Sequence, residues 1–174
     1  MKSLALIPPS FLLLVSTSLA DWPFWRGDLA GSGVTTETKL PTEWDKEKNV
    51  KWRVALSEAG NSSPVISGDR IFLTQPNTEK KLRGLLCLDR KSGKTLWEKS
   101  VEYDAKERTH RTNHFCSSSP ATDGERVIVA YGSAGIFCYT HDGRELWQQD
   151  LGTIDHVWGY GSSPLIYENL CIHY

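Results

Sequence analysis

A unit of four predicted strands lies between Ser117 and Trp147 of this 174-residue chain. Short apolar runs such as residues 126–131 alternate with tight turns at Asp123-Gly124 and Asp142-Gly143. This alternation is typical of β-hairpins, because glycine and aspartate readily adopt the positive φ that hairpin turns need. The pattern therefore predicts four antiparallel strands that follow one another along the chain, with Trp147 in the last of them.

The same unit recurs on both sides of this stretch. An earlier copy runs from Ser62 to Trp97, and a later copy opens with Ser162-Ser163-Pro164. Trp52, Trp97 and Trp147 follow one another at intervals of about 45–50 residues, a spacing at which four strands and one late tryptophan predict the blades of a β-propeller. One blade cannot bury both faces of its small sheet, so each blade needs neighbours.

The repeated segments resemble a known family. Each copy contains Ser-Ser-Pro, followed by Gly-Asp-Arg-Ile-Phe-Leu (68–73) or Gly-Glu-Arg-Val-Ile-Val (124–129), and the first copy ends in Leu-Asp-x-x-x-Gly-Lys-x-Leu-Trp (88–97). This pattern resembles the pyrroloquinoline-quinone-like (PQQ-like) propeller repeat of quinoprotein alcohol dehydrogenases and of BamB-type outer-membrane assembly factors. From Trp22 onward the chain resembles the N-terminal part of secreted PQQ-binding-like repeat proteins of planctomycete-type bacteria. Further matching segments are Trp22-Pro23-x-x-Arg26-Gly27, Leu40-Pro41-Thr42-Glu43-Trp44 and Gly132-Ser133-Ala134-Gly135.

The resemblance implies an all-β fold, a β-propeller of four-stranded antiparallel blades. Propellers of this family close with about eight blades, whereas residues 51–174 hold about two and a half copies of the repeat. We therefore expect an incomplete propeller and interpret the chain as an N-terminal fragment.

The first twenty residues read as a secretory signal peptide. Lys2 gives the N-terminal region a positive charge, and residues 4–15 form an apolar stretch. Ser18-Leu19-Ala20 matches a small-x-small cleavage site. An apolar stretch of about twelve residues is too short to span a bilayer. We expect a mature chain that starts at Asp21, is periplasmic or secreted, and has no integral membrane segment after cleavage.

Residues 21–50 are expected to form an N-terminal strap across the propeller. Three aromatic residues stand near its start: Trp22, Phe24 and Trp25. They are expected to pack on the propeller body, and the alternative is an aromatic platform for sugars or cations. Residues 50–56 alternate in polarity and predict an outer strand around Trp52. Residues 75–84 are polar and read as a solvated loop.

The connection between the first two copies, residues 101–116, holds the highest concentration of side chains that could bind a metal or a ligand. His110, His114 and Cys116 have side chains that bind zinc or copper, but no fourth ligand stands close by. The alternative is that the connection lies on a propeller face, with four polar residues lining it: His110, Arg111, Asn113 and His114. The equivalent connection before the third copy holds His156, Trp158 and Tyr160. His114 and Trp158 would then flank one entrance, although the simpler expectation is that Trp158 packs between blades.

The four cysteines, an even number in a chain predicted to be exported, leave the disulfide state open. They are Cys87, Cys116, Cys138 and Cys171. Cys87 and Cys138 occupy equivalent positions before their tryptophans, and equivalent positions in adjacent blades need not lie within bonding distance. Mostly free, buried thiols are expected.

No motif in the chain identifies a catalytic, cofactor-binding or metal-binding residue, and no cofactor is predicted. A dehydrogenase of the resembled family would need adjacent cysteines and a calcium site, and no hydrolase Gly-x-Ser-x-Gly occurs. Ser117-Ser118-Ser119 belongs to the repeat, and the net charge of −1 gives no argument for nucleic acid. We therefore expect a non-catalytic binding or scaffold module whose partner is a protein or another envelope component. The alternatives are a fragment of a PQQ-dependent dehydrogenase and a truncated product without a function of its own.

Overall fold

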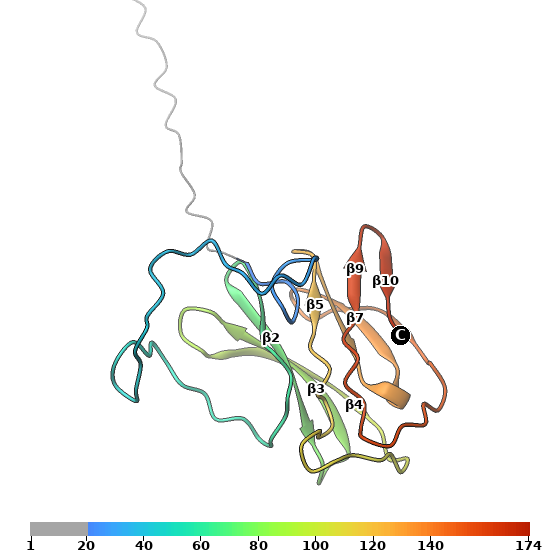
Figure 1. The fold of residues 1–174 in the computed structure, drawn as a ribbon. Coiled ribbons are helices and arrows are strands. Elements are labelled where there is room, and N and C mark those ends of the chain that lie inside the picture. Colours follow the sequence, from blue (N-terminus) through green and yellow to red (C-terminus); the bar gives the residue numbers. More distant parts are fainter. Residues whose placement is uncertain (1–20) are drawn as a thin grey trace, which may run out of the picture.

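The computed structural model describes residues 21–174, and the predicted signal peptide lies outside them. Three antiparallel sheets succeed one another along the chain (Figure 1). Blade 1 consists of β1 (Val65–Ser67), β2 (Arg70–Asn77), β3 (Leu82–Asp89) and β4 (Thr95–Glu102). Blade 2 consists of β5 (Ala121–Thr122), β6 (Arg126–Ala130), β7 (Ile136–Thr140) and β8 (Glu145–Gln149), with the 3₁₀ turn η1 (Gly132–Ala134) before β7. Blade 3 consists of β9 (Leu165–Tyr167) and β10 (Leu170–Ile172).

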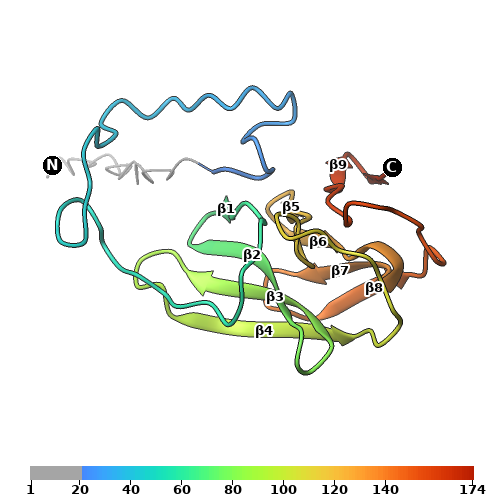
Figure 2. The same cartoon turned by 60° about the horizontal axis from the view of Figure 1, so that its bottom comes forward.

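The predicted fold class is confirmed. Within blades 1 and 2 the strands pair in sequence order, β1-β2-β3-β4 and β5-β6-β7-β8. The first strands β1, β5 and β9 lie on the side where the N-terminal segment crosses the blades (Figure 2). Among residues 21–174 no helix is long and apolar enough to cross a membrane.

The two complete blades repeat each other down to single positions. Cys87 pairs with Trp97 between β3 and β4, and Cys138 pairs with Trp147 between β7 and β8. Each strand pair has its β-bulge directly after the cysteine. The predicted equivalence of Cys87 and Cys138 is therefore confirmed.

Apolar side chains on facing sheets form the core between blades. Blades 1 and 2 share a cluster that includes Phe72, Leu85, Val129 and Phe137. The other face of blade 2 contributes Ile128 and further residues to a second cluster that reaches blade 3. Burial between sheets explains why the strands read as continuous apolar runs rather than as strict alternation.

Two of the repeated tryptophans, Trp52 and Trp97, dock on the blade that follows them in the chain. The Trp97 indole N–H donates to the carbonyl oxygen of His141 at 2.9 Å, and its ring lies over Gly143. Trp52 repeats both contacts one blade earlier, donating to Arg90 at 3.0 Å and covering Gly93. Glycine is required at both turns, because a Cβ there would lie within 3 Å of the indole ring and φ is positive.

One expectation about blade 1 is wrong, and another holds only in part. Residues 50–56 form no strand, because Trp52 docks through its side chain while the backbone finds no partner strand among the described residues. The stretch 75–84 is a solvated loop only at residues 78–81, which form an exposed turn, since β2 continues to Asn77 and β3 begins at Leu82. Pairing between β2 and β3 extends to the end of both strands and buries Arg83.

The Ser-Ser-Pro repeat forms a hydrogen-bonded series across the blades. The backbone N–H of Ser63 donates to the Ser119 hydroxyl at 2.8 Å. The backbone N–H of Ser119 donates in turn to the Ser163 hydroxyl at 2.9 Å. The hydroxyls of Ser119 and Ser163, each directly before proline, thus satisfy a backbone N–H of the preceding copy, which gives the recurring serine a structural role.

Replacing Ser119 with alanine should destabilise the chain by about 0.5–1.5 kcal/mol, because the partly buried N–H of Ser63 loses its acceptor. Urea unfolding followed by tryptophan fluorescence measures the change. Ser100→Ala is the control, because Ser100 is exposed and its hydroxyl makes only a long contact with Glu98. Equal stability of the two variants would show that the serine series does not hold the blades together.

His141 lies at the joint between blades 1 and 2. Besides Trp97, the Arg70 guanidinium donates to its carbonyl oxygen. Its Nε2 pairs with the Thr122 hydroxyl at 2.8 Å, and its ring packs 5.0 Å from that of Phe72. Burial, followed by the charge of Arg70, lowers the pKa of His141.

We therefore expect the chain to lose stability as the pH falls from about 7.5 to about 5.5. The pKa of His141 is lower in the folded chain than its ordinary value of 6.5, so the folded state binds fewer protons than the unfolded state. The contribution of the neutral His141 ring to the stability of the folded chain is fully present above the pKa of the unfolded chain. It is lost as the pH falls below that value. His141→Gln should weaken this dependence in urea unfolding. Burial also lowers the pKa of His173, which supplies the remaining dependence; an unchanged pH profile would refute the assignment to His141.

The start of the N-terminal segment is fixed to two blades at once. Trp22 and Ile66 exchange backbone hydrogen bonds of 2.9 and 2.8 Å, and the N–H of Thr122 donates to the Pro23 carbonyl at 3.0 Å. Phe24 is buried in the cluster between blades 2 and 3, whereas Trp25 remains 53% exposed. The expectation of packed aromatics therefore holds for Trp22 and Phe24 and fails for Trp25, whose ring is contacted by the neighbouring Arg26 guanidinium.

Candidate functional site

The two connections between blades meet at one end of the sheets. We name them loop 1 (residues 103–120) and loop 2 (residues 150–164). The Asn113 side-chain amide donates to the Trp158 carbonyl at 2.9 Å, and the rings of His110 and Trp158 lie 5.3 Å apart, edge to face. The two connections therefore lie on one face, which is the condition under which His114 and Trp158 would flank one entrance.

The structure corrects the two expectations for Trp158. It does not pack between blades, because its backbone is held at the rim by Asn113 and 67% of its surface is exposed. Its histidine neighbour is His110, whereas His114 lies in a separate hollow beside Glu58 and Phe115.

The proposed ligands of the metal hypothesis do not converge. His110 Nδ1 lies 2.8 Å from the Thr112 hydroxyl at the surface, while Cys116 is buried in the core between blades 1 and 2. Burial raises the pKa of the Cys116 thiol to about 12, which disfavours the thiolate that metals bind. Within residues 21–174 no three His, Cys, Asp or Glu side chains come together.

All four cysteines are free thiols. Burial raises the pKa of both Cys87 and Cys138 to about 11, so these thiols are protonated at neutral pH and behave as small apolar groups.

A buried polar group, which sequence reasoning missed, ties the loops to the blades. We name it the Glu107 cluster (Arg83, Glu107, Ser133 and His156). One Glu107 carboxylate oxygen accepts a hydrogen bond from the Ser133 backbone N–H at 3.2 Å and lies 3.4 Å from His156 Nε2. The other lies 3.8 Å from the Arg83 guanidinium. Glu107 thus connects loop 1, loop 2, blade 1 and η1 of blade 2.

Both charges of the cluster are withdrawn from water. The side chains of Arg83 and Glu107 are 4% and 6% exposed, and the Phe115 ring stacks 3.6 Å from the Arg83 guanidinium carbon. Charges at this depth persist only when they are paired. The Glu107 cluster therefore fixes the geometry of the loops.

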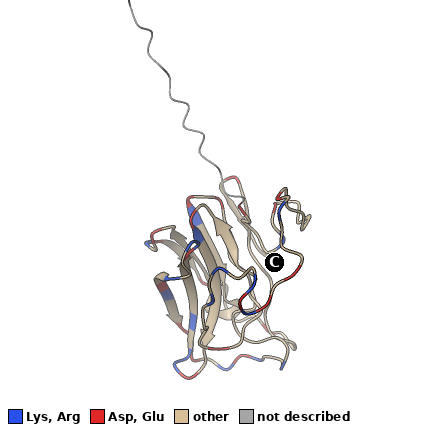
Figure 3. Cartoon of the chain, turned by 90° about the vertical axis from the view of Figure 1, so that its left-hand side faces the viewer, with Lys and Arg blue, Asp and Glu red and all other residues tan. Residues whose placement is uncertain are grey.

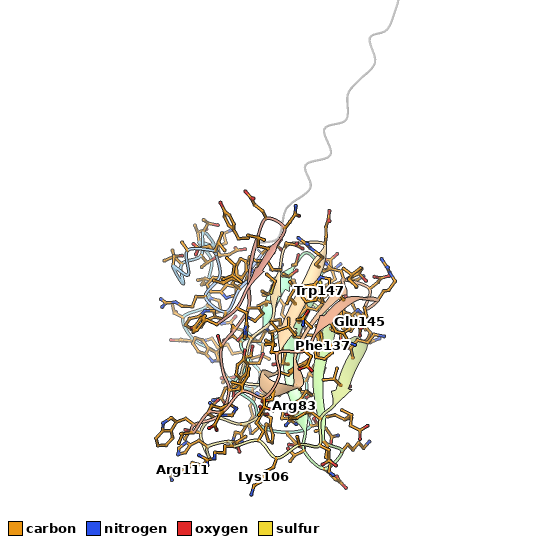
Figure 4. The ribbon with its side chains drawn as sticks, turned by 90° about the vertical axis from the view of Figure 1, so that its right-hand side faces the viewer. Arg83, Lys106, Arg111, Phe137, Glu145 and Trp147 are labelled. Carbon is orange, nitrogen blue, oxygen red and sulfur yellow. The ribbon has the colours of Figure 1, made fainter. Side chains whose placement is uncertain are left out.

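Above this cluster lies an open groove of about 380 Å³ between the two loops. Glu107 and His156 contribute to its lining, together with side chains of both signs: Lys106, Arg108 and Asp155. Figure 4 shows Arg83 among the sheets, while Lys106 and Arg111 point outward at the rim. Basic and acidic residues are interspersed along the blades and loops (Figure 3).

Comparison with known proteins identifies the repeat. The sequence model of the family described as outer membrane protein assembly factor BamB matches residues 31–153 and 83–172. The chain belongs to this family. The PQQ-like repeats expected from the sequence are therefore confirmed. No curated protein sequence matches the chain.

Two solved structures are similar to this BamB-family chain. BamB from Moraxella catarrhalis matches at 19% identity with a TM-score of 0.46, over 71% of this chain and 33% of the BamB chain. A europium-containing methanol dehydrogenase matches at 13% identity with a TM-score of 0.62, over 87% of this chain and 27% of the dehydrogenase. The second likeness shows the propeller fold. The chain spans about a third or less of each of these proteins.

Proposed function

We propose that this BamB-family chain is part of an exported, non-catalytic propeller that binds a protein partner in the cell envelope through the face formed by loops 1 and 2. The observation that carries the proposal is the position of Trp158, which is 67% exposed while its backbone carbonyl accepts a hydrogen bond from the Asn113 amide. Exposed tryptophan and arginine side chains dominate the energy of protein interfaces, and Arg111 is exposed on the adjacent loop.

The rigid base of this face supports binding rather than catalysis. A loop that is ordered before association loses less conformational entropy on binding. The Glu107 cluster and the hydrogen bond from the Asn113 amide to the Trp158 carbonyl fix loops 1 and 2 in this way. The buried charges hold the loops together and leave the outward side chains to make contacts.

Site-specific photo-crosslinking tests the proposal. A photoreactive phenylalanine analogue at position 158 of the complete chain, expressed in a bacterial envelope, should crosslink to a defined envelope protein. The same analogue at position 44 is the matched control, since Trp44 is also an exposed tryptophan but lies in the N-terminal segment. Crosslinks at both positions, or at neither, would argue against a specific face.

Two further measurements test export and the absence of catalysis. Mass spectrometry of the exported chain should find Asp21 as the first residue, in the periplasmic or secreted fraction. The purified chain should show no quinone absorbance, and titration with pyrroloquinoline quinone and calcium should leave its fluorescence unchanged. Stoichiometric quinone binding would reverse the ranking of scaffold over dehydrogenase.

A further inference from the structure

Tyr131 leaves a polar atom unpaired in the interior. It directly follows β6, and its ring packs 5.9 Å from that of Phe137 in the core between blades 1 and 2. Its hydroxyl is completely buried and has no hydrogen-bond partner among the described protein atoms. A buried hydroxyl without a partner costs about 1–3 kcal/mol, so native structures almost always satisfy such a group with protein or with ordered water.

The hydroxyl belongs to a residue that lines a small cavity. The cavity measures about 10 Å³, and Tyr131, Arg83 and Glu107 are among the residues that line it. Apolar surface from Phe115, Ala130 and other neighbours closes the rest. About 10–15 Å³ is the smallest space that holds one water molecule, and such a water needs two to four polar partners.

The ion pair beside the cavity is also incompletely satisfied. Arg83 Nη2 and the nearer Glu107 oxygen are 3.8 Å apart, beyond the length of a direct hydrogen bond. That Glu107 oxygen is not the one that accepts from Ser133. The Phe115 ring stacks on the guanidinium, 3.6 Å from its carbon. A polar contact longer than about 3.5 Å leaves both groups able to bond to a water between them.

We infer that the cavity binds one structural water molecule that joins Tyr131, Arg83 and Glu107. The water accepts a hydrogen bond from the Arg83 guanidinium and donates one to the free Glu107 oxygen. Its second hydrogen or second lone pair is left for the Tyr131 hydroxyl, which can accept or donate. The three groups come from β3, loop 1 and the end of β6, so the water completes the seal between blades 1 and 2. This inference is independent of the proposed partner binding.

Tyr131→Phe distinguishes a hydrated cavity from a dry one by the sign of its effect. If the water is present, the variant removes one of its partners, and the equilibrium constant for unfolding should rise about three- to tenfold. If the cavity is dry, the variant removes an unsatisfied hydroxyl, and the same constant should fall. Tyr139→Phe is the control, since Tyr139 packs in the same cluster and does not line the cavity.

A crystal structure of the complete chain provides the direct test. The inference predicts a single electron-density peak within hydrogen-bond distance of all three groups, and its loss in Tyr131→Phe. An empty cavity in the unsubstituted chain would overturn the inference, as would a Tyr131→Phe variant more stable than the parent.

Discussion

Replacing Glu107 with alanine is expected to destabilise the chain by about 3–5 kcal/mol, because the variant leaves the Arg83 charge buried without its counter-charge. The same change removes the acceptor of the Ser133 N–H and the partner of His156. Glu107→Gln keeps an acceptor but loses the charge, so we expect an intermediate loss. Urea unfolding at neutral pH, followed by tryptophan fluorescence, measures all three proteins.

Asp104→Ala is the matched control for the buried pair. Asp104 lies in the same loop and forms an ion pair of 2.5 Å with Lys81, yet its side chain is 65% exposed. Exposed pairs contribute only about 0–1 kcal/mol. The Lys81–Asp104 pair is therefore shorter than the Arg83–Glu107 pair, yet its loss should cost less. Burial rather than distance determines the cost of losing a charged partner. Similar losses in Asp104→Ala and Glu107→Ala would contradict this account.

The Glu107 variant also connects stability to the proposed binding face. If the Glu107 cluster holds loops 1 and 2 together, Glu107→Ala should reduce crosslinking from position 158 under conditions in which the sheets remain folded. Asp104→Ala should leave crosslinking unchanged. Undiminished crosslinking in a folded Glu107→Ala chain would show that the two loops keep their arrangement without the cluster.

The sequence was sufficient for the sheets because their signals are local and repeated. Turns such as Asp142-Gly143 and apolar runs such as residues 126–130 fix the strands, and the recurring tryptophan fixes their order. The same tryptophan pattern misled at residues 50–56, because a docked indole and a fourth strand have the same sequence signature. Only the presence or absence of a pairing strand separates the two cases.

The candidate site was harder to predict because its contacts are distant in sequence and do not repeat. Arg83 and Glu107 come from different elements, and neither has a counterpart in the other blade. Arg83 did carry a signal: it stands directly before the apolar run of β3, where a charged residue needs a buried partner. Its partner could not be chosen from sequence alone, since loop 1 offers two carboxylates, Asp104 and Glu107. The prediction that Trp158 packs between blades failed for a related reason. Its backbone is held by the side-chain amide of Asn113, which belongs to another loop.

Replacing Phe24 with alanine is expected to cost about 3–5 kcal/mol through loss of buried surface and formation of a cavity. The benzyl ring enters the cluster that joins blade 2 to Ile166 of blade 3, so its removal should loosen the two-stranded sheet first. Trp25→Ala deletes a larger ring from the adjacent, exposed position and should change stability by less than about 0.5 kcal/mol. Hydrogen exchange followed by mass spectrometry should show faster exchange in residues 165–172 of Phe24→Ala and an unchanged rate there in Trp25→Ala.

The contrast between these neighbouring aromatic residues tests what the N-terminal segment does. If its backbone bonds to Ile66 and Thr122 were sufficient, Phe24→Ala would retain a protected blade 3. We expect the opposite, because blade 3 has only two strands in the described chain and shares its apolar contacts with Phe24 and blade 2. Equal exchange in the two variants would mean that the segment lies on the blades without stabilising them. Selective loss of protection in Phe24→Ala would establish the segment as a structural part of the propeller that stabilises blade 3 through the Phe24 side chain.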